Sequence, residues 1–330
     1  MSKMMKRGIL MLLLLISVSA GIIYYTIDLE ALKTIRSFNA VSLLLALLAL
    51  TLGMYFDGLR LQRLVKIGGY KLSIQAVLRV IFSNYFMAML TPGASGGAVA
   101  QVLVLKSYGV PLGKGTPIVL IRTVFSIMFL VVMLPFVFFH DAIEIPYISR
   151  NMLLVFAVVA VIATLLGTYI LQTKYMRQFV YRLAKYFKVD KTKDWLSKLE
   201  TLNQGLGLLY KKPGQSIVVF FESGLSLLCL YCIAPALMYA FTSDIHIIDV
   251  LDRMILLNLI LYFAPTPGGT GIAEGLFVVL FGPFVPAGTV GIVAVAWRVV
   301  AEYLPFFIGM YAVLTLYGRQ FVAQETSHEQ

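Results

Sequence analysis

The chain alternates long apolar runs with short polar segments from one end to the other. A helix needs about 20 mostly apolar residues to cross the hydrocarbon layer of a bilayer. The runs of that length predict about six full transmembrane helices. They lie at about Gly8–Ile27, Asn39–Phe56, Thr116–Phe139, Asn151–Leu171, Ser216–Phe241 and Thr289–Tyr317.

Two further apolar segments, at about 74–114 and 250–286, are interrupted by Pro and Gly. The interruptions read TPGASGGA at 91–98 and TPGGTGIA at 266–273. A broken helix at membrane depth is tolerated only where protein or a water-filled cavity satisfies the freed backbone groups. We therefore expect two re-entrant helical hairpins around a polar site.

The two interrupted segments are copies of one repeat. Asn84 and Asn258 lie seven and eight residues before the Thr that opens each loop, and Arg122 and Arg298 lie 31 and 32 residues after it. In the topology drawn through the apolar runs, the first hairpin opens from the cytoplasm and the second from outside. The repeats, at about 74–139 and 250–317, are then inverted across the membrane plane, an arrangement that recurs in transporters.

Composition supports a membrane protein. Of the 330 residues 60% are hydrophobic and 13% are charged, with a mean hydropathy of +0.88. These values exceed the apolar share of soluble domains. We expect an all-α polytopic membrane protein, formed by a single integral domain over residues 1–330.

The net charge of +11 is distributed as topology requires. In the expected topology 20 of the 27 Lys and Arg lie in cytoplasmic segments, 4 outside and 3 within the membrane. This bias is the positive-inside rule, and it argues against nucleic-acid binding. It places the protein in the cell membrane, with both termini in the cytoplasm. The most basic segment, 174–212, is either an amphipathic element on the anionic leaflet or a solvated connector.

The N-terminal run admits two interpretations. Lys3, Lys6 and Arg7 precede it, and VSA at 18–20 resembles a signal-peptide cleavage site. The apolar character continues to Ile27, so we expect a retained helix. The two cysteines, Cys229 and Cys232, lie in an apolar run without a nearby His, which favours packing over a metal site. No cofactor is expected.

Several charged residues fall within or near the apolar layer. Each costs on the order of 2.5 to 3.5 kcal/mol at the membrane centre on insertion scales, so such residues are functional candidates. The alternative is a set of internal ion pairs that lock helices together. Arg298 and Glu302 are four residues apart, on one helical face. The candidates are Arg79, Arg122, Glu222, Glu274, Arg298 and Glu302.

The Gly-rich loops add backbone donors to these side chains. Half-helices that begin at the loops would offer unpaired N–H groups and a positive dipole end to an anionic group. A guanidinium suits bidentate contact with phosphate, so Arg122 and Arg298 are the first choice for a headgroup. The loop residues expected at the substrate are Thr91, Gly93, Gly96, Thr266, Gly268, Gly269 and Gly271.

The segment PTPGGTGIAE at 265–274 resembles a motif of the lysylphosphatidylglycerol synthase transmembrane-region family, the flippase-like domain of the multiple peptide resistance factor. The first loop, at 91–97, is similar to that family's first Pro-Gly motif. The resemblance covers nearly the whole chain, as in stand-alone members without the aminoacyl-transferase domain, so we expect no lipid aminoacylation. It places Glu274 on the family's acidic position. Ala98 and Ala273 depart from the family's pattern, in which an acid and a base are frequent there.

The resemblance implies movement of a lipid or other amphiphile with a polar, anionic headgroup between leaflets. No nucleotide-binding motif is present, so transport is expected to be passive or ion-coupled. Two alternatives stay open: a secondary transporter of a water-soluble anionic metabolite, and a non-catalytic cell-envelope scaffold. An enzyme is not expected, because the sequence contains no His cluster, Asp-rich metal motif or activated nucleophile. Membrane lipids are the expected partners, and homo-oligomerisation is left open.

Overall fold

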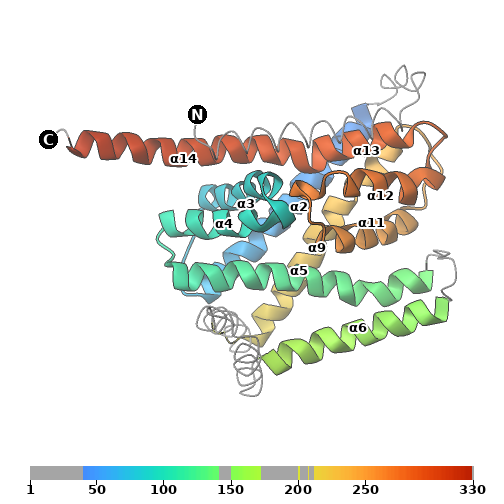
Figure 1. Ribbon diagram of the computed structural model, residues 1–330, viewed down its shortest axis with the longest axis horizontal. Helices are drawn as coiled ribbons and strands as arrows, with labels where there is room; N and C mark the ends of the chain where they lie inside the picture. The colour runs from blue at the N-terminus through green and yellow to red at the C-terminus, as the bar shows by residue number, and fades with distance from the viewer. Residues whose placement is uncertain (1–39, 141–149, 172–199, 201–206, 208–211, 329–330) are drawn as a thin grey trace, which may run out of the picture.

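The computed structural model describes residues 40–140, 150–171, 200, 207 and 212–328 (Figure 1). The predicted span Gly8–Ile27 and all but three residues of the basic segment 174–212 lie outside them. The described residues form helices and contain no strand. In chain order the elements are α2 (Ala40–Ile67), α3 (Ile74–Leu90), η2 (Pro92–Ala94), α4 (Ser95–Ser107), α5 (Leu112–His140), α6 (Arg150–Leu171), α9 (Pro213–Tyr231), α10 (Ile233–Met238), α11 (Ile247–Leu261), η3 (Pro267–Gly269), α12 (Ile272–Phe281), η4 (Gly282–Phe284), α13 (Val290–Arg298), η5 (Val299–Tyr303) and α14 (Leu304–His328).

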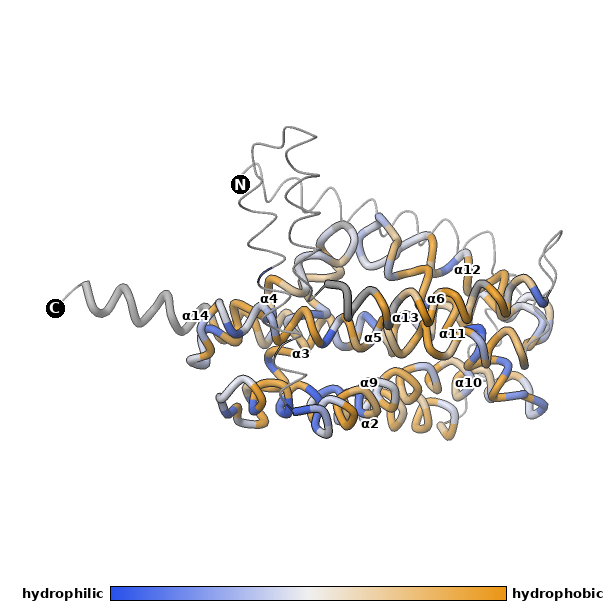
Figure 2. The backbone as a smooth tube through the Cα atoms, turned by 90° about the horizontal axis from the view of Figure 1, so that it is seen from below, coloured by the Kyte–Doolittle hydropathy of each residue, from blue (hydrophilic) through white to orange (hydrophobic). Residues whose placement is uncertain are grey.

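Four helical segments are long and apolar enough to cross a membrane. They are Ala40–Ile67, Leu112–Phe139, Pro213–Met238 and Val290–Leu316. Each contains most of a span predicted from the sequence, and the predicted span Asn151–Leu171 forms helix α6. Apolar colour covers most of the helical length in Figure 2. With large exposed apolar side chains on α2 and α6, these spans make a multi-pass membrane protein.

Both interrupted segments form helical hairpins. In the first, η2 connects α3 to α4, and in the second, η3 connects α11 to α12. Figure 1 shows the first hairpin in the left half of the molecule and the second in the right half. Their tips meet, because η2 contacts η3 and α3 also contacts η3. The two Pro-Gly loops therefore lie side by side near the middle of the long dimension.

The loops break the helices through left-handed backbone conformations. Gly93 has a φ of 59° and Gly268 a φ of 58°. Glycine adopts such angles without the steric cost that other residues incur. A side chain at Gly268 would also meet the first hairpin, since an ideal Cβ there lies 3.2 Å from Met89 Cγ. The glycine thus permits both the turn and the contact between tips.

The remaining helices enclose the hairpins. Helix α2 packs along α9 and α10, and these form the lower layer in Figure 2. Helix α5 packs against α4, α6, α9 and α11, so it contacts one arm of each hairpin. Helix α14 runs along α3, where Gly309 allows close approach to the Phe82 carbonyl.

Helix α2 corrects one sequence prediction. The helix was expected to end near Phe56 and to be followed by a basic cytoplasmic loop, but it continues to Ile67. The reason is that Leu61, Leu64 and Val65 continue a buried apolar face beyond the first polar residues. Asp57 and Arg60, which follow the predicted end of the span, are consequently inside the protein.

The last predicted span is confirmed as a continuous helical path with one irregular turn. It begins as α13, widens into the π-turn η5 and continues as α14. Pro305 is the second residue of α14, and a proline lacks the N–H that the carbonyl of Ala301 would accept in a regular helix. A π-turn accommodates such a break and frequently marks a functional position. This one contains Glu302.

Candidate functional site

The first cluster of buried charges, here named the Asp57 cluster, joins α2 to α5. Asp57, Arg60 and Arg122 are each at most 7% exposed. Asp57 accepts hydrogen bonds from Arg122 Nε, at 3.1 Å, from Arg122 Nη2, and from Arg60 Nε. Arg60 Nη1 donates to Ser126 Oγ at 2.8 Å. Two guanidinium groups therefore share one carboxylate.

Amide side chains tie this cluster to the first hairpin. Arg122 Nη1 donates to Gln101 Oε1 on α4. Gln101 Nε2 in turn donates to Asn84 Oδ1 on α3, at 2.7 Å. Gly97 permits this contact, because an ideal Cβ there would lie 2.4 Å from Asn84 Oδ1. Arg122 is thus connected to both arms of the hairpin that precedes it in the sequence.

The second cluster, here named the Glu274 cluster, joins the second hairpin to α13 and η5. Arg298 is 2% exposed, and its Nε donates to Glu274 Oε1 at 3.0 Å. Its Nη1 donates to the Gly268 carbonyl at 3.0 Å and to the Glu302 carboxylate. Glu274 Oε2 accepts from the Gly271 N–H at 2.7 Å, which caps the start of α12. One guanidinium therefore meets two carboxylates and a loop carbonyl.

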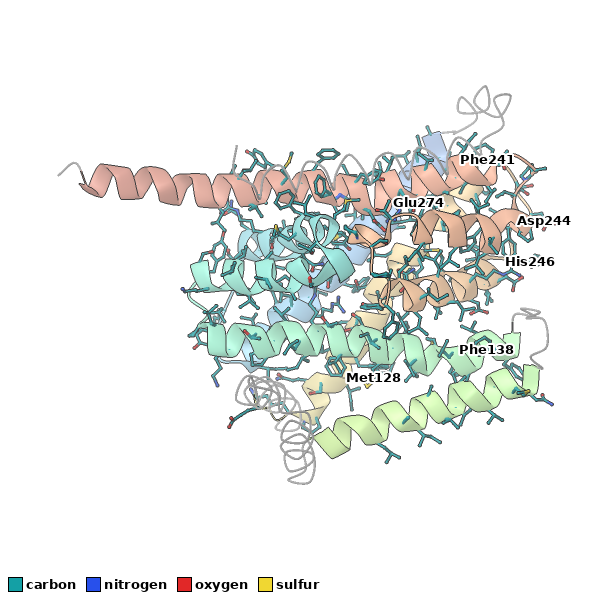
Figure 3. All side chains as sticks on the ribbon, viewed as in Figure 1. Met128, Phe138, Phe241, Asp244, His246 and Glu274 are labelled. Atoms are coloured by element: carbon teal, nitrogen blue, oxygen red, sulfur yellow. The ribbon has the colours of Figure 1, made fainter. Side chains whose placement is uncertain are left out.

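The two clusters have opposite net charges when all their groups are ionised. The Asp57 cluster holds two arginines and one acid, a net charge of +1. The Glu274 cluster holds one arginine and two acids, a net charge of −1. Figure 3 shows Glu274 in the interior of the molecule, inward from Asp244 and His246, which lie at one end. Each cluster alone carries an unbalanced charge, and buried charges within membrane-spanning segments are costly and mark functional candidates.

Two buried donor atoms beside the η3 loop have no hydrogen-bond partner among the described residues. They are Arg298 Nη2 and Thr266 Oγ1. Nearly all buried polar groups in proteins are hydrogen-bonded, so unpartnered donors call for an explanation. A guanidinium N–H and a hydroxyl both donate hydrogen bonds, so an oxygen atom of a ligand could accept from either of them.

Arg122 and Arg298, which occupy matching positions in the two repeats, bind side chains at corresponding places in the fold. Gln101 on α4 contacts Arg122, and Glu274 on α12 contacts Arg298, so each arginine binds the half-helix that follows its loop. The first copy carries a neutral amide at this contact and the second a carboxylate. Asp57 from α2 supplies the acid that the first half-helix lacks.

Tyr85 interacts electrostatically with both clusters. Its hydroxyl is within electrostatic range of Asp57 and Arg122 in one and of Glu302 in the other. Tyr85 belongs to α3, whose C-terminal end leads into η2. The clusters are therefore neighbours at the meeting point of the hairpin tips.

Glu222 lies apart from both clusters. It forms a bidentate pair with Arg63, in which Nη2 lies 2.6 Å from Oε1 and Nε lies 3.0 Å from Oε2. The Arg63 side chain is 37% exposed. This pair connects α2 to α9, the helices that pack most extensively against each other. Its geometry is that of a structural ion pair.

The loop residues partly differ from their predicted role. The Gly96 N–H donates to Thr91 Oγ1 at 2.8 Å, and Thr91 donates to the Met87 carbonyl at 2.8 Å. The Gly271 N–H is bound by Glu274. The prediction that these half-helix N-termini offer unpaired N–H groups is therefore wrong at Gly96 and Gly271. Thr91 closes its turn, whereas Gly93, Gly268 and Gly269 shape theirs through positive φ angles.

Sequence reasoning missed three members of the Asp57 cluster. Arg60 was assigned to a loop after the predicted span, and Asp57 and Gln101 were not singled out. The signal for the first two was the apolar pattern, which continues past them to Ile67 at helical spacing. An acid and a base three residues apart on a helix that stays apolar indicate an internal pair.

Comparison with known proteins agrees with the family resemblance of the two Pro-Gly motifs. The sequence profile described as the lysylphosphatidylglycerol synthase TM region matches residues 10–309. The chain belongs to this family. A UPF0104 membrane protein of Archaeoglobus fulgidus is 23% identical over 315 residues, which cover 92% of this chain and 94% of the relative. The lysylphosphatidylglycerol synthase TM region thus spans both clusters, and the resemblance read from the two Pro-Gly motifs is confirmed.

Proposed function

We propose that this protein moves a lipid, or another amphiphile with an anionic headgroup, between the leaflets of the cell membrane. The family description refers to the membrane region of a lipid synthase, which favours a lipid over a soluble metabolite. The substrate would meet the protein where the two hairpin tips touch, close to both buried clusters.

The observation that carries the proposal is the excess positive charge of the Asp57 cluster. Arg122 and Arg60 share one carboxylate, so this cluster alone carries a net charge of +1 that attracts an anion. A phosphate offers the planar, bidentate contact that guanidinium groups prefer. Arg122 and Arg60 are the proposed contacts of the headgroup in this cluster, and Arg298 is the contact from the other copy.

The hairpins are proposed to be re-entrant and inverted relative to each other. The base of the first hairpin lies at the end that carries Lys71, Lys106 and Lys114, and the base of the second lies at the end that carries Asp244 (Figures 1 and 3). The positive-inside rule assigns the basic end to the cytoplasm. Each hairpin would then control access from one side, with the tips shared.

Leaflet exchange in proteoliposomes tests the proposal. Purified protein is reconstituted, and the exchange of lipids with labelled phosphate headgroups is followed with a membrane-impermeant quencher. We expect exchange well above protein-free vesicles. Arg122→Gln is expected to slow it about ten- to a hundredfold, because a hydrogen bond to a charged group contributes about 1.5 to 3 kcal/mol.

Arg79→Gln is the matched control. Arg79 donates to the Tyr108 hydroxyl at 2.7 Å and belongs to neither cluster, so its replacement should leave exchange near the wild-type rate. Wild-type protein that accelerates exchange for none of several headgroups would contradict the proposal. Uptake of inorganic phosphate in the same vesicles, without lipid exchange, would favour the soluble-anion transporter.

A further inference from the structure

The Glu274 cluster contains one more acid than its arginine can neutralise. Arg298 is bound on Nε by Glu274 and on Nη1 by Glu302 and the Gly268 carbonyl. Both carboxylates lie between apolar helices, where an unbalanced charge is expensive. The neighbouring Asp57 cluster carries the opposite charge, and a bound proton is the simplest group that removes the excess within the Glu274 cluster itself.

The two carboxylates differ in how their charge is supported. Glu274 accepts on both oxygens, from Arg298 Nε and from the Gly271 N–H, and its side chain is 4% exposed. Hydrogen bonds donated to a carboxylate favour its ionised form. In the described structure Glu302 accepts from Arg298 on Oε2, and the Glu302 side chain is 23% exposed. Glu302 is therefore the acid that takes the proton more readily, and it is also the more accessible one.

We infer that Glu302 is a proton-binding site whose occupancy decides whether Arg298 can bind the substrate anion. Protonation of Glu302 leaves Arg298 with one ionised partner. The guanidinium, whose Nη2 already has no partner in the described structure, then has charge and donors to offer a phosphate oxygen. Proton and headgroup would load together, so the cluster returns to a net charge of −1 after binding a singly charged anion.

The charged and titratable groups around Glu302 leave one ion pair that its protonation would change. From α13 and α12 the facing charges are Arg298 and Glu274, and from α3 the Tyr85 hydroxyl is within electrostatic range. Helix α2, which also packs against η5, carries Asp57 and Arg60 in the other cluster. None of these neighbours except Arg298 pairs with Glu302 in the described structure, so its protonation changes one ion pair only.

The site also has a mechanical connection to the hairpin. Arg298 Nη1 holds the Gly268 carbonyl at the tip as well as Glu302. Glu302 lies in the π-turn before Pro305, where the helix already departs from regular geometry. Release of Glu302 from Arg298 would therefore weaken two things at once: the contact of Arg298 with the hairpin tip and the packing of the π-turn in the last helix.

Infrared difference spectroscopy tests the proton site without any transport. A pH titration of the reconstituted wild type should reveal a protonated-carboxyl stretching band that is missing in Glu302→Gln and present in Asp244→Asn, the control at an exposed carboxylate. Glu302→Asp, which keeps a carboxyl group, should retain a shifted band. The other acids of the chain contribute bands of their own, so a Glu302→Gln difference spectrum that matches the wild-type spectrum band for band, in a folded protein, would overturn the inference.

Lipid exchange tests the consequence for transport, which rests on the proposed function. The wild-type rate should rise as the pH falls, by up to about tenfold per pH unit, because one unit changes the ratio of protonated to ionised acid about tenfold. Glu302→Gln, a permanently neutral side chain, should exchange lipid without this dependence. Exchange that ignores pH in the wild type would contradict proton control, whereas no exchange under any condition would contradict the proposed function.

Discussion

Asp57 balances two buried guanidinium groups at once. It accepts from Arg60 and from Arg122, and each of the three residues is at most 7% exposed. Removal of one partner from a buried ion cluster leaves uncompensated charge, which is far more destabilising than the loss of a surface pair. The structural and the functional interpretation of this cluster therefore coexist: the same excess of positive charge that would bind an anion makes Asp57 indispensable.

Replacement of Asp57 should destabilise the protein strongly. Asp57→Asn leaves two facing guanidinium groups without a carboxylate, and we expect a loss of about 3 to 5 kcal/mol, typical of broken buried ion pairs. Thermal unfolding in detergent measures it, with exposed Asp244→Asn as the control.

The double variant Asp57→Asn/Arg122→Gln restores the original net charge of the cluster. Its unfolding midpoint should lie above the value expected if the two single effects simply added. Strict additivity would contradict the shared-carboxylate geometry.

At this scale the sequence identified the second cluster better than the first. Glu274, Arg298 and Glu302 stand in an apolar context, where charge is conspicuous, and two of them share a helical face. Asp57 and Arg60 stand next to Arg63 and Lys66, so they resembled the start of a basic loop. Only the three-dimensional path of α2 distinguishes the inward charges from those at the helix end.

The helical hairpins depend on glycines that allow close approach. Gly309 on α14 faces α3 so closely that an ideal Cβ would lie 2.0 Å from the Phe82 carbonyl and 3.0 Å from Phe86 Cβ. Backbone cannot move aside as a side chain does, so α14 would have to shift away from the first hairpin. Small residues commonly permit such contacts between helices in membranes.

Gly309→Ala should therefore destabilise the protein, by about 1 to 3 kcal/mol for overpacking. Gly275→Ala is the matched control within a helix, because nothing lies within 4 Å of its ideal Cβ. Alanine is favoured over glycine in helices by about 1 kcal/mol, so this variant should be neutral or slightly stabilising. Equal thermal midpoints for the two variants would argue against the observed packing of α14 on α3.

Elements were the most predictable level of the structure. The helix α3 and the breaks at both Pro-Gly loops lie where the apolar pattern and the turn residues predicted them. The end of α2 was mispredicted because apolar periodicity alone does not reveal which charges have partners. The π-turn was not anticipated, although Pro305 marks the place where a regular helix loses a hydrogen bond.

In the molecule as a whole, the two hairpins occupy opposite halves and meet at their tips (Figure 1). Arg298 of the Glu274 cluster contacts the tip through the Gly268 carbonyl. The repeated spacing of loops and arginines predicted that the copies correspond. It did not predict that α2, outside the repeat, would supply the acid of the first cluster. Long-range partners of this kind leave no local pattern, because they depend on how helices far apart in sequence pack together.

Cysteine accessibility tests the central claim, that the hairpins open to opposite sides of the membrane. Gly113→Cys marks the base of the first hairpin and Ser243→Cys the base of the second, in a chain whose Cys229 and Cys232 are replaced by Ala; both positions are exposed. A membrane-impermeant maleimide added to intact cells should label the Ser243→Cys protein and leave the Gly113→Cys protein unlabelled until the cells are opened. Labelling of both proteins from the same side would contradict the inverted arrangement and the mechanism built on it.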